Sequence, residues 1–346
     1  MIESVTSTVD SEALIDTAEQ NVKDILNIVF NHTTQENAVV VYDTNSLLST
    51  VLMKAYRRCL PDALFIDFNM QAPEDTRIQL EALEASAFVA LLQSTNFRLD
   101  AFRIRVELFK KKIKVIEHPH LSRISNEDAK YYIDALAYDA DYYRGTGPAL
   151  KQKIDAATSC TIDSGGELLV YSGPFESAKL NIGDYTEMPN TGGQFPIGEV
   201  FTEAQDLKAV NGRLNIMIFG DITFKINRPK VPITLIIEGG QVVDCENATP
   251  EFTEVLSMIR KAEGVVWIRE LGFGLNRAFT KTRTVGDVGS FERMCGVHVS
   301  LGAKHGMYGK PGFKRRSGRY HVDIFADTHT VTLGDEVIYR EGAWRV

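Results

Sequence analysis

Two histidines and an aspartate near the C-terminal end of the chain have the types and spacing of metal ligands. His298 lies in the apolar run 296–302, and His321 and Asp323 lie in the run 320–325. Because His321 and Asp323 are two residues apart, a β-strand would point both side chains to one face. Imidazole nitrogens and carboxylate oxygens are usual ligands of zinc and other first-row metals. Taken singly, each residue also fits a buried histidine or a surface ion pair. Together with the carboxylates upstream, they favour a metal site.

Two glutamates upstream add to this set. Glu270 ends a β-type run within residues 264–276 and shares one face of it with Val266 and Ile268. Burying a carboxylate there is costly unless a cation or a metal meets it. Glu199 follows a segment that contains glycine and proline, which break regular structure. Each glutamate alone also fits a side chain that turns out to water.

The first half of the chain alternates short apolar runs with amphipathic helical periodicity. This alternation predicts an open parallel sheet covered by helices on both faces. Polar loops at 43–46 and 93–96 follow two of the predicted strands, where either helix capping or ligand binding is expected, and we favour capping because no glycine-rich phosphate loop is present. The predicted strands lie at 37–43, 63–68, 87–93 and 113–118, and the predicted helices at 11–31, 47–59, 74–85, 98–110 and 126–143.

The second half of the chain has a different pattern. The alternation ends near the glycine- and proline-containing segment 144–148, and further β-type runs follow, among them 213–220, 222–226, 233–238 and 241–245. Gly165 and Gly166 separate two of these runs, as in a β-hairpin. The sequence therefore predicts an α/β fold with two domains. Residues 1–150 form an open parallel α/β sheet domain, and residues 151–346 form a β-rich α+β domain that binds metal and carries the catalytic site.

Composition and the N-terminal residues limit the binding partners and the cellular location that we expect. The formal net charge of −8 gives no reason to expect binding to nucleic acid or to anionic membranes. The four cysteines are widely spaced, without a disulfide framework, which favours a cytoplasmic protein. The N-terminal residues lack the basic segment and apolar core of a signal peptide, and we expect none. No apolar run is long enough to span a bilayer.

Four segments of the C-terminal half occur in an order that resembles a known enzyme family. They read Pro-Ile-Gly-Glu-Val-Phe-Thr (196–202), Glu-Leu-Gly-Phe-Gly-Leu-Asn (270–276), Gly-Val-His-Val-Ser-Leu-Gly (296–302) and His-Val-Asp-Ile-Phe (321–325). They are similar to the metal-site blocks of the thermophilic leucyl aminopeptidase T and S family, and the resemblance covers residues 161–325. It implies a homodimeric metallopeptidase with two zinc or cobalt ions, one carboxylate bridging them, and five metal ligands: Glu199, Glu270, His298, His321 and Asp323.

The resemblance implies a function and leaves two alternatives. The expected activity is that of an aminopeptidase-like hydrolase, which removes N-terminal residues from peptides with a water activated by two metals. A relative of the same fold, 2,5-dihydroxypyridine dioxygenase, uses two histidines and one aspartate to hold a single Fe(II), and His298, His321 and Asp323 match that set. The third possibility is a relative without hydrolytic activity that acts on a peptide or small molecule in a biosynthetic pathway.

The chain departs from the family at one catalytic position and in one loop. The family has a tyrosine seven residues after the first metal-site histidine, where this chain has His305, with Tyr308 three residues further on. We expect His305 and Tyr308 to be catalytic, His305 as an oxyanion stabiliser or proton shuttle. A basic loop follows, which is either a solvated loop or a flap that binds a substrate carboxylate. Its basic residues are Lys310, Lys314, Arg315, Arg316 and Arg319, of which the three arginines are the expected substrate-binding residues.

Overall fold

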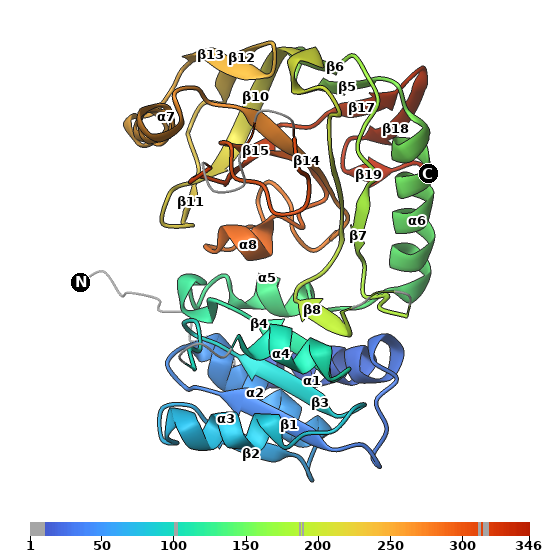
Figure 1. Cartoon of the computed structure of the whole chain (residues 1–346), viewed down its shortest axis with the longest axis vertical. Helices are drawn as coiled ribbons and strands as arrows, with labels where there is room; N and C mark the ends of the chain where they lie inside the picture. Colours follow the sequence, from blue (N-terminus) through green and yellow to red (C-terminus); the bar gives the residue numbers. More distant parts are fainter. Residues whose placement is uncertain (1–10, 100–102, 187, 189, 311–312, 314–317) are drawn as a thin grey trace, which may run out of the picture. The chain divides into compact units, whose positions relative to one another are not determined.

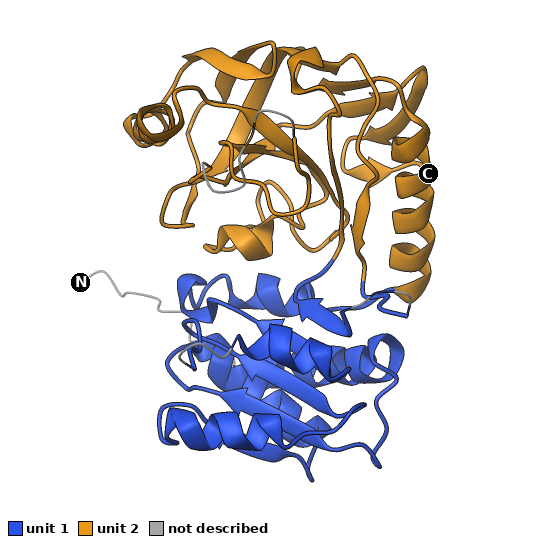
Figure 2. Cartoon of the chain, in the orientation of Figure 1, with its two compact units in different colours: residues 1–139, 183–197 blue, residues 140–182, 198–346 orange. Residues whose placement is uncertain are grey.

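The computed structural model describes the chain except residues 1–10, 100–102, 187, 189, 311–312 and 314–317. It divides into two compact units, shown in Figures 1 and 2: unit 1 comprises residues 1–139 and 183–197, and unit 2 comprises residues 140–182 and 198–346. The predicted domains, 1–150 and 151–346, differ from these units in two places. The helix after residue 139 belongs to unit 2, and residues 183–197 return to unit 1 to add a strand to its sheet.

Unit 1 confirms the predicted open parallel sheet. Its five strands run parallel in the order β2-β1-β3-β4-β8. The central strand β3 (Phe88–Leu92) is buried at every residue, as expected for a parallel strand covered on both faces. The other strands are β1 (Ala38–Tyr42), β2 (Leu64–Asp67), β4 (Lys114–His118) and β8 (Gly192–Gln194).

The helices of unit 1 begin where polar residues follow the strands. Ser46 accepts a hydrogen bond from the Ser49 backbone N–H and caps α2 (Leu47–Cys59). The Asp43 carboxylate accepts from the backbone N–H of Ser94, 2.8 Å away. The polar loops after β1 and β3 are therefore bound to one another and to a helix N-terminus. The remaining helices are α1 (Ser11–Asp24), the π-helix η1 (Ile25–Val29), α3 (Pro73–Glu81), α4 (Ile104–Lys110), the 3₁₀ helix η2 (Leu121–Arg123) and α5 (Ala129–Asp134).

Unit 2 is built on a large antiparallel sheet. Its main strand order is β19-β18-β17-β5-β6-β10-β16-β15-β14-β9-β7, and β11, β12 and β13 attach through β10. The predicted hairpin at Gly165 and Gly166 joins β5 and β6. The strands are β5 (Cys160–Asp163), β6 (Leu168–Tyr171), β7 (Lys179–Asn181), β9 (Glu199–Glu203), β10 (Val210–Gly220), β11 (Ile226–Asn227), β12 (Ile233–Glu238), β13 (Gln241–Glu246), β14 (Ile268–Gly274), β15 (Gly296–Leu301), β16 (Val322–Ala326), β17 (Thr330–Leu333), β18 (Glu336–Arg340) and β19 (Ala343–Trp344).

Two segments of unit 2 differ from the sequence prediction. Residues 144–148 lie inside the helix α6 (Ala140–Ala156), where Gly147 packs so closely on Ile182 that a Cβ would lie 2.8 Å from its Cγ2. Glycine at 147 therefore serves close packing and not a turn. Residues 222–224 of the predicted strand 222–226 form a turn instead, because the Asp221 carboxylate accepts the backbone N–H groups of Thr223 and Lys225.

The remaining helices of unit 2 are short or lie against the sheet. They are η3 (Leu207–Ala209), α7 (Pro250–Glu263) and α8 (Val288–Phe291). Thr249 caps α7 by accepting a hydrogen bond from the Phe252 N–H, and Phe252, Val255 and Ile259 form its buried face. Among the residues that the structure describes, no helix combines the length and apolar character needed to cross a membrane.

Candidate metal centre

Four adjacent strands of unit 2 bring the five predicted ligands together. Glu199 begins β9, Glu270 lies on β14, His298 on β15 and Asp323 on β16, and these strands are neighbours in the sheet. His321 lies directly before β16. Antiparallel pairing aligns Gly272 with His298 and Ser300 with Asp323. Residues more than 120 positions apart in the chain thus reach one site through strand register.

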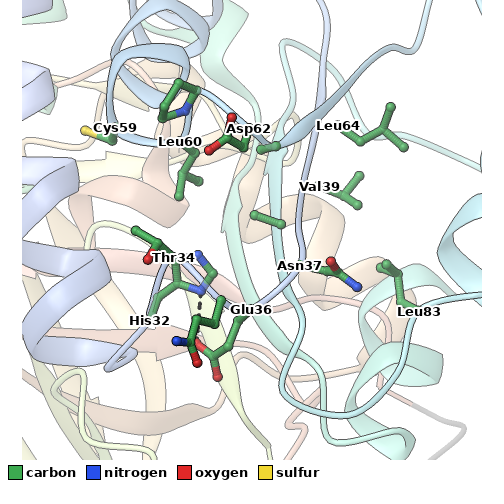
Figure 3. Close-up of a pocket in the computed structure, with 14 residues that line it drawn as sticks. His32, Thr34, Glu36, Asn37, Val39, Cys59, Leu60, Asp62, Leu64 and Leu83 are labelled. Carbon is green, nitrogen blue, oxygen red and sulfur yellow. Dashed lines mark ion pairs between the residues drawn. The ribbon is translucent and has the colours of Figure 1, made fainter.

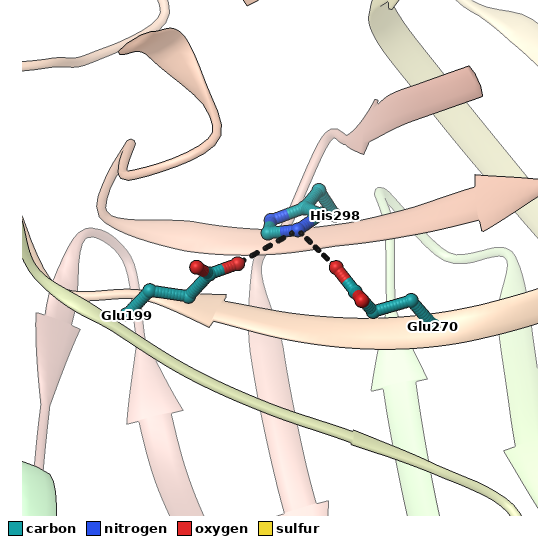
Figure 4. A group of neighbouring side chains, drawn as sticks. All are labelled: Glu199, Glu270 and His298. Carbon is teal, nitrogen blue, oxygen red and sulfur yellow. Dashed lines mark ion pairs between the residues drawn. The ribbon is translucent and has the colours of Figure 1, made fainter. Parts of the chain in front are cut away.

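The first ligand group consists of Glu199, Glu270 and His298 (Figure 4). His298 Nε2 lies 3.2 Å from Glu199 Oε1 and 3.6 Å from Glu270 Oε1. One ligand atom from each residue falls within 4.8 Å of the others. This group offers a divalent metal one nitrogen and two oxygen ligands.

The second group shares a residue with the first. It consists of Glu270, His321 and Asp323, again with ligand atoms within 4.8 Å of one another. His321 Nε2 lies 3.1 Å from Asp323 Oδ1. The Lys304 carbonyl lies 3.2 Å from His321 Nδ1, and a hydrogen bond donated by Nδ1 leaves Nε2 available as a ligand. Glu270 is therefore the carboxylate placed to serve both groups.

Two local backbone features position these side chains. A Cβ at Gly272 would lie 2.0 Å from His298 Cε1, so only glycine lets the imidazole lie across β14. A β-bulge between Ile268 and Leu271 places two residues of β14 opposite Ser300 of β15. There the Glu270 N–H donates to the Ser300 hydroxyl at 3.0 Å. The bulge sets the direction in which the Glu270 side chain leaves the strand.

Two buried polar atoms of the site lack an aligned hydrogen bond, and a metal ion would satisfy both. His298 Nε2 and Asp323 Oδ1 are buried without an aligned hydrogen bond, although charged groups lie nearby. Leaving such atoms unsatisfied costs about 1–3 kcal/mol each. His298 is only 1% exposed, so bulk water does not supply the missing hydrogen bond to its Nε2. A cation coordinated by the surrounding oxygen and nitrogen atoms would remove this cost, and the donor set suits a divalent ion.

Electrostatics at the site concentrate positive charge on the histidines. Burial alone would lower the pKa of His298, but the adjacent carboxylates of Glu199 and Glu270 outweigh burial and raise it well above its ordinary value. The Asp323 carboxylate likewise outweighs burial and raises the pKa of His321 to about 10. Burial opposes ionisation of Glu270, but His298 and His305 hold the pKa of this carboxyl well below its usual range. The carboxylates thus attract positive charge into a buried position.

An arginine and a glutamate that the sequence analysis missed adjoin the first ligand group. Arg293 Nη1 lies 3.1 Å from Glu199 Oε2, and it also binds the Glu292 carboxylate. With its amide oxygen turned toward the guanidinium, Asn181 accepts from Arg293 Nη2 at 3.1 Å. Burial, reinforced by the nearby carboxylates of Glu199 and Asp323, raises the pKa of Glu292 to about 8 despite the adjacent Arg293. A charged pair within the mainly apolar segment before His298 was the available sequence signal.

His305 reaches the shared carboxylate from a loop. His305 Nε2 lies 3.1 Å from Glu270 Oε2. Its Nδ1 accepts hydrogen bonds from the backbone N–H groups of Met307 and Tyr308, both at 3.2 Å. Because Nδ1 is the acceptor, the proton of the neutral ring belongs on Nε2, which then donates to Glu270. This arrangement makes His305 a donor to a ligand of the site and not a ligand itself.

Tyr308 points its hydroxyl at the backbone. The hydroxyl donates to the Ser177 carbonyl at 2.8 Å, with the Phe201 carbonyl at 3.3 Å. Burial raises the pKa of this phenol. The Tyr308 ring packs 5.1 Å from the ring of His305, centroid to centroid. The side chain therefore supports the loop that carries His305.

The basic residues after Tyr308 have different surroundings. Lys310 is buried and binds Glu176 Oε1 at 2.6 Å. The backbone N–H of Arg319 donates to Glu263 Oε1 at 2.6 Å, while its side chain is exposed. Lys314, Arg315 and Arg316 lie outside the described residues, so the predicted roles of Arg315 and Arg316 stay predictions.

A cavity in unit 1 lacks comparable chemistry. It measures about 370 Å³ and is lined by residues that include His32, Glu36 and Cys59 (Figure 3). The Glu36 carboxylate already accepts from Lys114 and from the backbone N–H of Thr33. Burial lowers the pKa of His32 and raises that of the Cys59 thiol to about 11. A neutral imidazole and a protonated thiol give this cavity no reactive group.

Comparison with known proteins gives a match of fold. No family model and no curated protein sequence matches the chain. Among solved structures, wild-type AmpT from Thermus thermophilus is similar, with a TM-score of 0.57 and 13% sequence identity. The alignment covers 96% of this chain and 99% of AmpT. At this identity the likeness shows a shared fold across both units, and activity has to be argued from the site.

Proposed function

We propose that this protein is a metal-dependent, aminopeptidase-like hydrolase that removes N-terminal residues from peptides and holds two divalent ions of the zinc or cobalt kind. The observation that carries the proposal is the sharing of Glu270 by two separate ligand groups. A carboxylate with one group on each side suits a pair of metals a few Å apart. The fold shared with AmpT agrees with the resemblance of the four sequence blocks to the aminopeptidase T and S family.

The charge of the site distinguishes two ions from one. Glu199, Glu270 and Asp323 bring three negative charges, and Arg293 brings one positive charge because the raised pKa of Glu292 keeps that carboxyl mostly protonated at pH 7. Two divalent ions therefore leave two excess positive charges, and a single ion leaves the site neutral. Only the positive site favours loss of a proton from water and polarises a peptide carbonyl. The second reading, a single Fe(II) held by His298, His321 and Asp323, has less support because the two histidines belong to different groups.

The residues of the chain take distinct parts in this proposal. Bound divalent ions would act as Lewis acids and lower the pKa of a water. The carboxylates also attract the protonated N-terminus of a peptide. Glu292, linked to Glu199 through Arg293, is the candidate acid–base group: its protonated carboxyl gives a proton to the leaving amine and regains one from the attacking water. His305 holds Glu270 in orientation through Nε2 and is placed to move a proton there.

Metal analysis of the purified protein tests this proposal. We expect about two zinc or cobalt ions per chain, and about one after Glu270→Ala, because the shared ligand is lost. Glu238→Ala, an exposed glutamate on β12, is the matched control and should keep both ions. One iron per chain, retained by Glu270→Ala and accompanied by oxygen uptake on a dihydroxy-aromatic, would replace the hydrolase with the dioxygenase. Absence of bound metal after anaerobic reconstitution would overturn both.

The sequence also predicts properties that this proposal does not include. The homodimer, the cytoplasmic location and the lack of nucleic-acid and membrane partners stay predictions from the sequence. A non-hydrolytic biosynthetic role would show as a full complement of metal without cleavage of any peptide.

A further inference from the structure

A cleft in unit 2 reaches the candidate metal centre from one side. It has a volume of about 390 Å³, and its lining includes His321, Ile222, Phe224, Lys304 and Arg319. Because His321 is also a member of the second ligand group, the cleft leads directly to that group. A volume of this size accommodates a small molecule or one amino-acid residue.

Two cations flank His321 in this cleft. The Lys304 backbone carbonyl lies within hydrogen-bond distance of His321 Nδ1, and Arg319 precedes His321 by two residues. Both side chains are exposed, and neither has an ion pair within the part of the chain that the structure describes. The cations near the carboxylates differ, since Arg269, Arg293 and Lys310 are buried and paired with glutamates. Lys304 and Arg319 are thus available to an anion from outside the protein.

Apolar side chains also line the cleft, next to Asp221, whose carboxylate is bound by backbone N–H groups of its own turn. Ile222 is 39% exposed and Phe224 is 51% exposed. Phe224 adopts a left-handed backbone conformation, with φ of 64°, in the turn held by Asp221. Bulky residues rarely adopt this conformation, so the turn presents the phenyl ring at a cost in backbone energy. Covering Ile222 and Phe224 with an apolar side chain would remove their contact with water.

We infer that this cleft binds the C-terminal residue of a dipeptide, with its free carboxylate between Lys304 and Arg319 and an apolar side chain against Ile222 and Phe224. The inference rests on the proposed function, because the scissile bond must lie at the metal centre. The separation between the metal centre and the two cations decides whether the bound peptide is short or long. One extended residue spans about 3.3–3.6 Å. Since the Lys304 backbone adjoins His321 and Arg319 precedes it by two residues, the carboxylate that the two cations bind belongs to the residue next to the scissile bond.

Paired substrates test the inference. We expect Leu-Leu to be hydrolysed with kcat/KM at least about tenfold above that of its C-terminal amide, mostly through KM, because one charge-assisted interaction distinguishes them. The double variant Lys304→Met/Arg319→Met should lose this preference, and Lys304→Arg/Arg319→Lys should keep it. Lys208→Met, at an exposed lysine outside the cleft, is the matched control. Equal rates for acid and amide, or a preference that survives in the double variant, would overturn the inference and leave the hydrolase standing.

A binding measurement separates failure of the cleft from failure of the hydrolase. The probe is Leu-Leu with its peptide bond reduced to CH₂–NH, as the free acid and as the amide, titrated calorimetrically into the metal-loaded protein. Tighter binding of the acid by about tenfold or more, lost in Lys304→Met/Arg319→Met, supports the cleft even if no peptide is cleaved. Equal binding of both forms overturns the cleft whether or not hydrolysis occurs. Unchanged metal content and circular dichroism of the double variant exclude misfolding as the cause.

Discussion

The buried histidines of the two units have opposite surroundings. In unit 1, His118 is fully buried, with its ring nitrogens 3.0 Å from the hydroxyls of Tyr56 and Tyr132. Tyr132 donates to the Phe195 carbonyl, so it accepts from His118 Nδ1, and Nε2 accepts from Tyr56. In unit 2, His298 is equally buried, but carboxylates surround it and its Nε2 has no aligned hydrogen bond.

This difference separates a structural histidine from a candidate ligand. Burial alone lowers the pKa of His118 to about 3, so its ring stays neutral and acts as part of the packing. At His298 the carboxylates outweigh burial and raise the pKa. Burial of an imidazole therefore says little about function. Unsatisfied nitrogen next to carboxylates marks the site that needs a cation.

The largest effect is expected from removing the unsatisfied histidine. His298→Gln deletes a ligand of the first group, so metal affinity should fall by more than the 10–100-fold that loss of an outer-shell partner costs, and peptidase activity should fall by about a thousandfold. Metal analysis after dialysis and peptide hydrolysis measure these effects. His118→Gln is the matched control, because it changes an equally buried histidine outside the site and should leave metal content unchanged. Full metal retention by His298→Gln would remove this residue from the centre.

A smaller effect on stability is expected in unit 1. His118→Leu leaves the Tyr56 hydroxyl without its partner and should lower the free energy of unfolding by about 1–3 kcal/mol at pH 7. The variant should also change the dependence on pH. The folded pKa of His118 is about 3 and lies below its unfolded value, so the unfolded chain binds the extra proton between these two values. Stability contributed by His118 is present above about pH 6.5 and is lost as pH falls toward 3, at about 1.4 kcal/mol per pH unit.

Urea unfolding of the metal-free protein at several pH values checks this expectation. Far-UV circular dichroism is the suitable probe, because both tryptophans, Trp267 and Trp344, lie in unit 2. Wild type should be the more stable protein above pH 6.5, and its advantage should shrink as pH falls and reverse before pH 3, because a loss of about 1.4 kcal/mol per pH unit over this range exceeds the initial difference. A constant difference across this range would show that the proton linkage of His118 is absent.

The smallest effect is expected at Tyr308. Tyr308→Phe removes the hydroxyl bound to the Ser177 carbonyl, which should cost about 1 kcal/mol of stability and change activity less than about threefold if the residue only supports the loop. Steady-state hydrolysis and urea unfolding measure both. Loss of activity by about a hundredfold or more at normal stability would instead make Tyr308 a general acid or base, as the sequence analysis expected.

The parts of the molecule that the sequence predicted well depend on local periodicity. Buried strands such as β3 and amphipathic helices such as α7 follow from the spacing of apolar residues within a short window. The placement of His321 and Asp323 near one another follows from the two-residue period of a strand. Local reasoning was wrong where tertiary packing decided the backbone, as at Gly147 in α6, whose missing Cβ accommodates Ile182.

The sequence by itself determined which residues have ligand chemistry and which strands carry them, because side-chain type and alternation are local properties. Only the tertiary structure decided that Glu270 serves two groups, because this depends on the register of β14 against β15 and on the bulge opposite Ser300. It likewise decided the contact of Arg293 with Glu199, which lie more than 90 positions apart. Antiparallel pairing of distant strands creates such contacts, and no local pattern encodes the register that sets their distances.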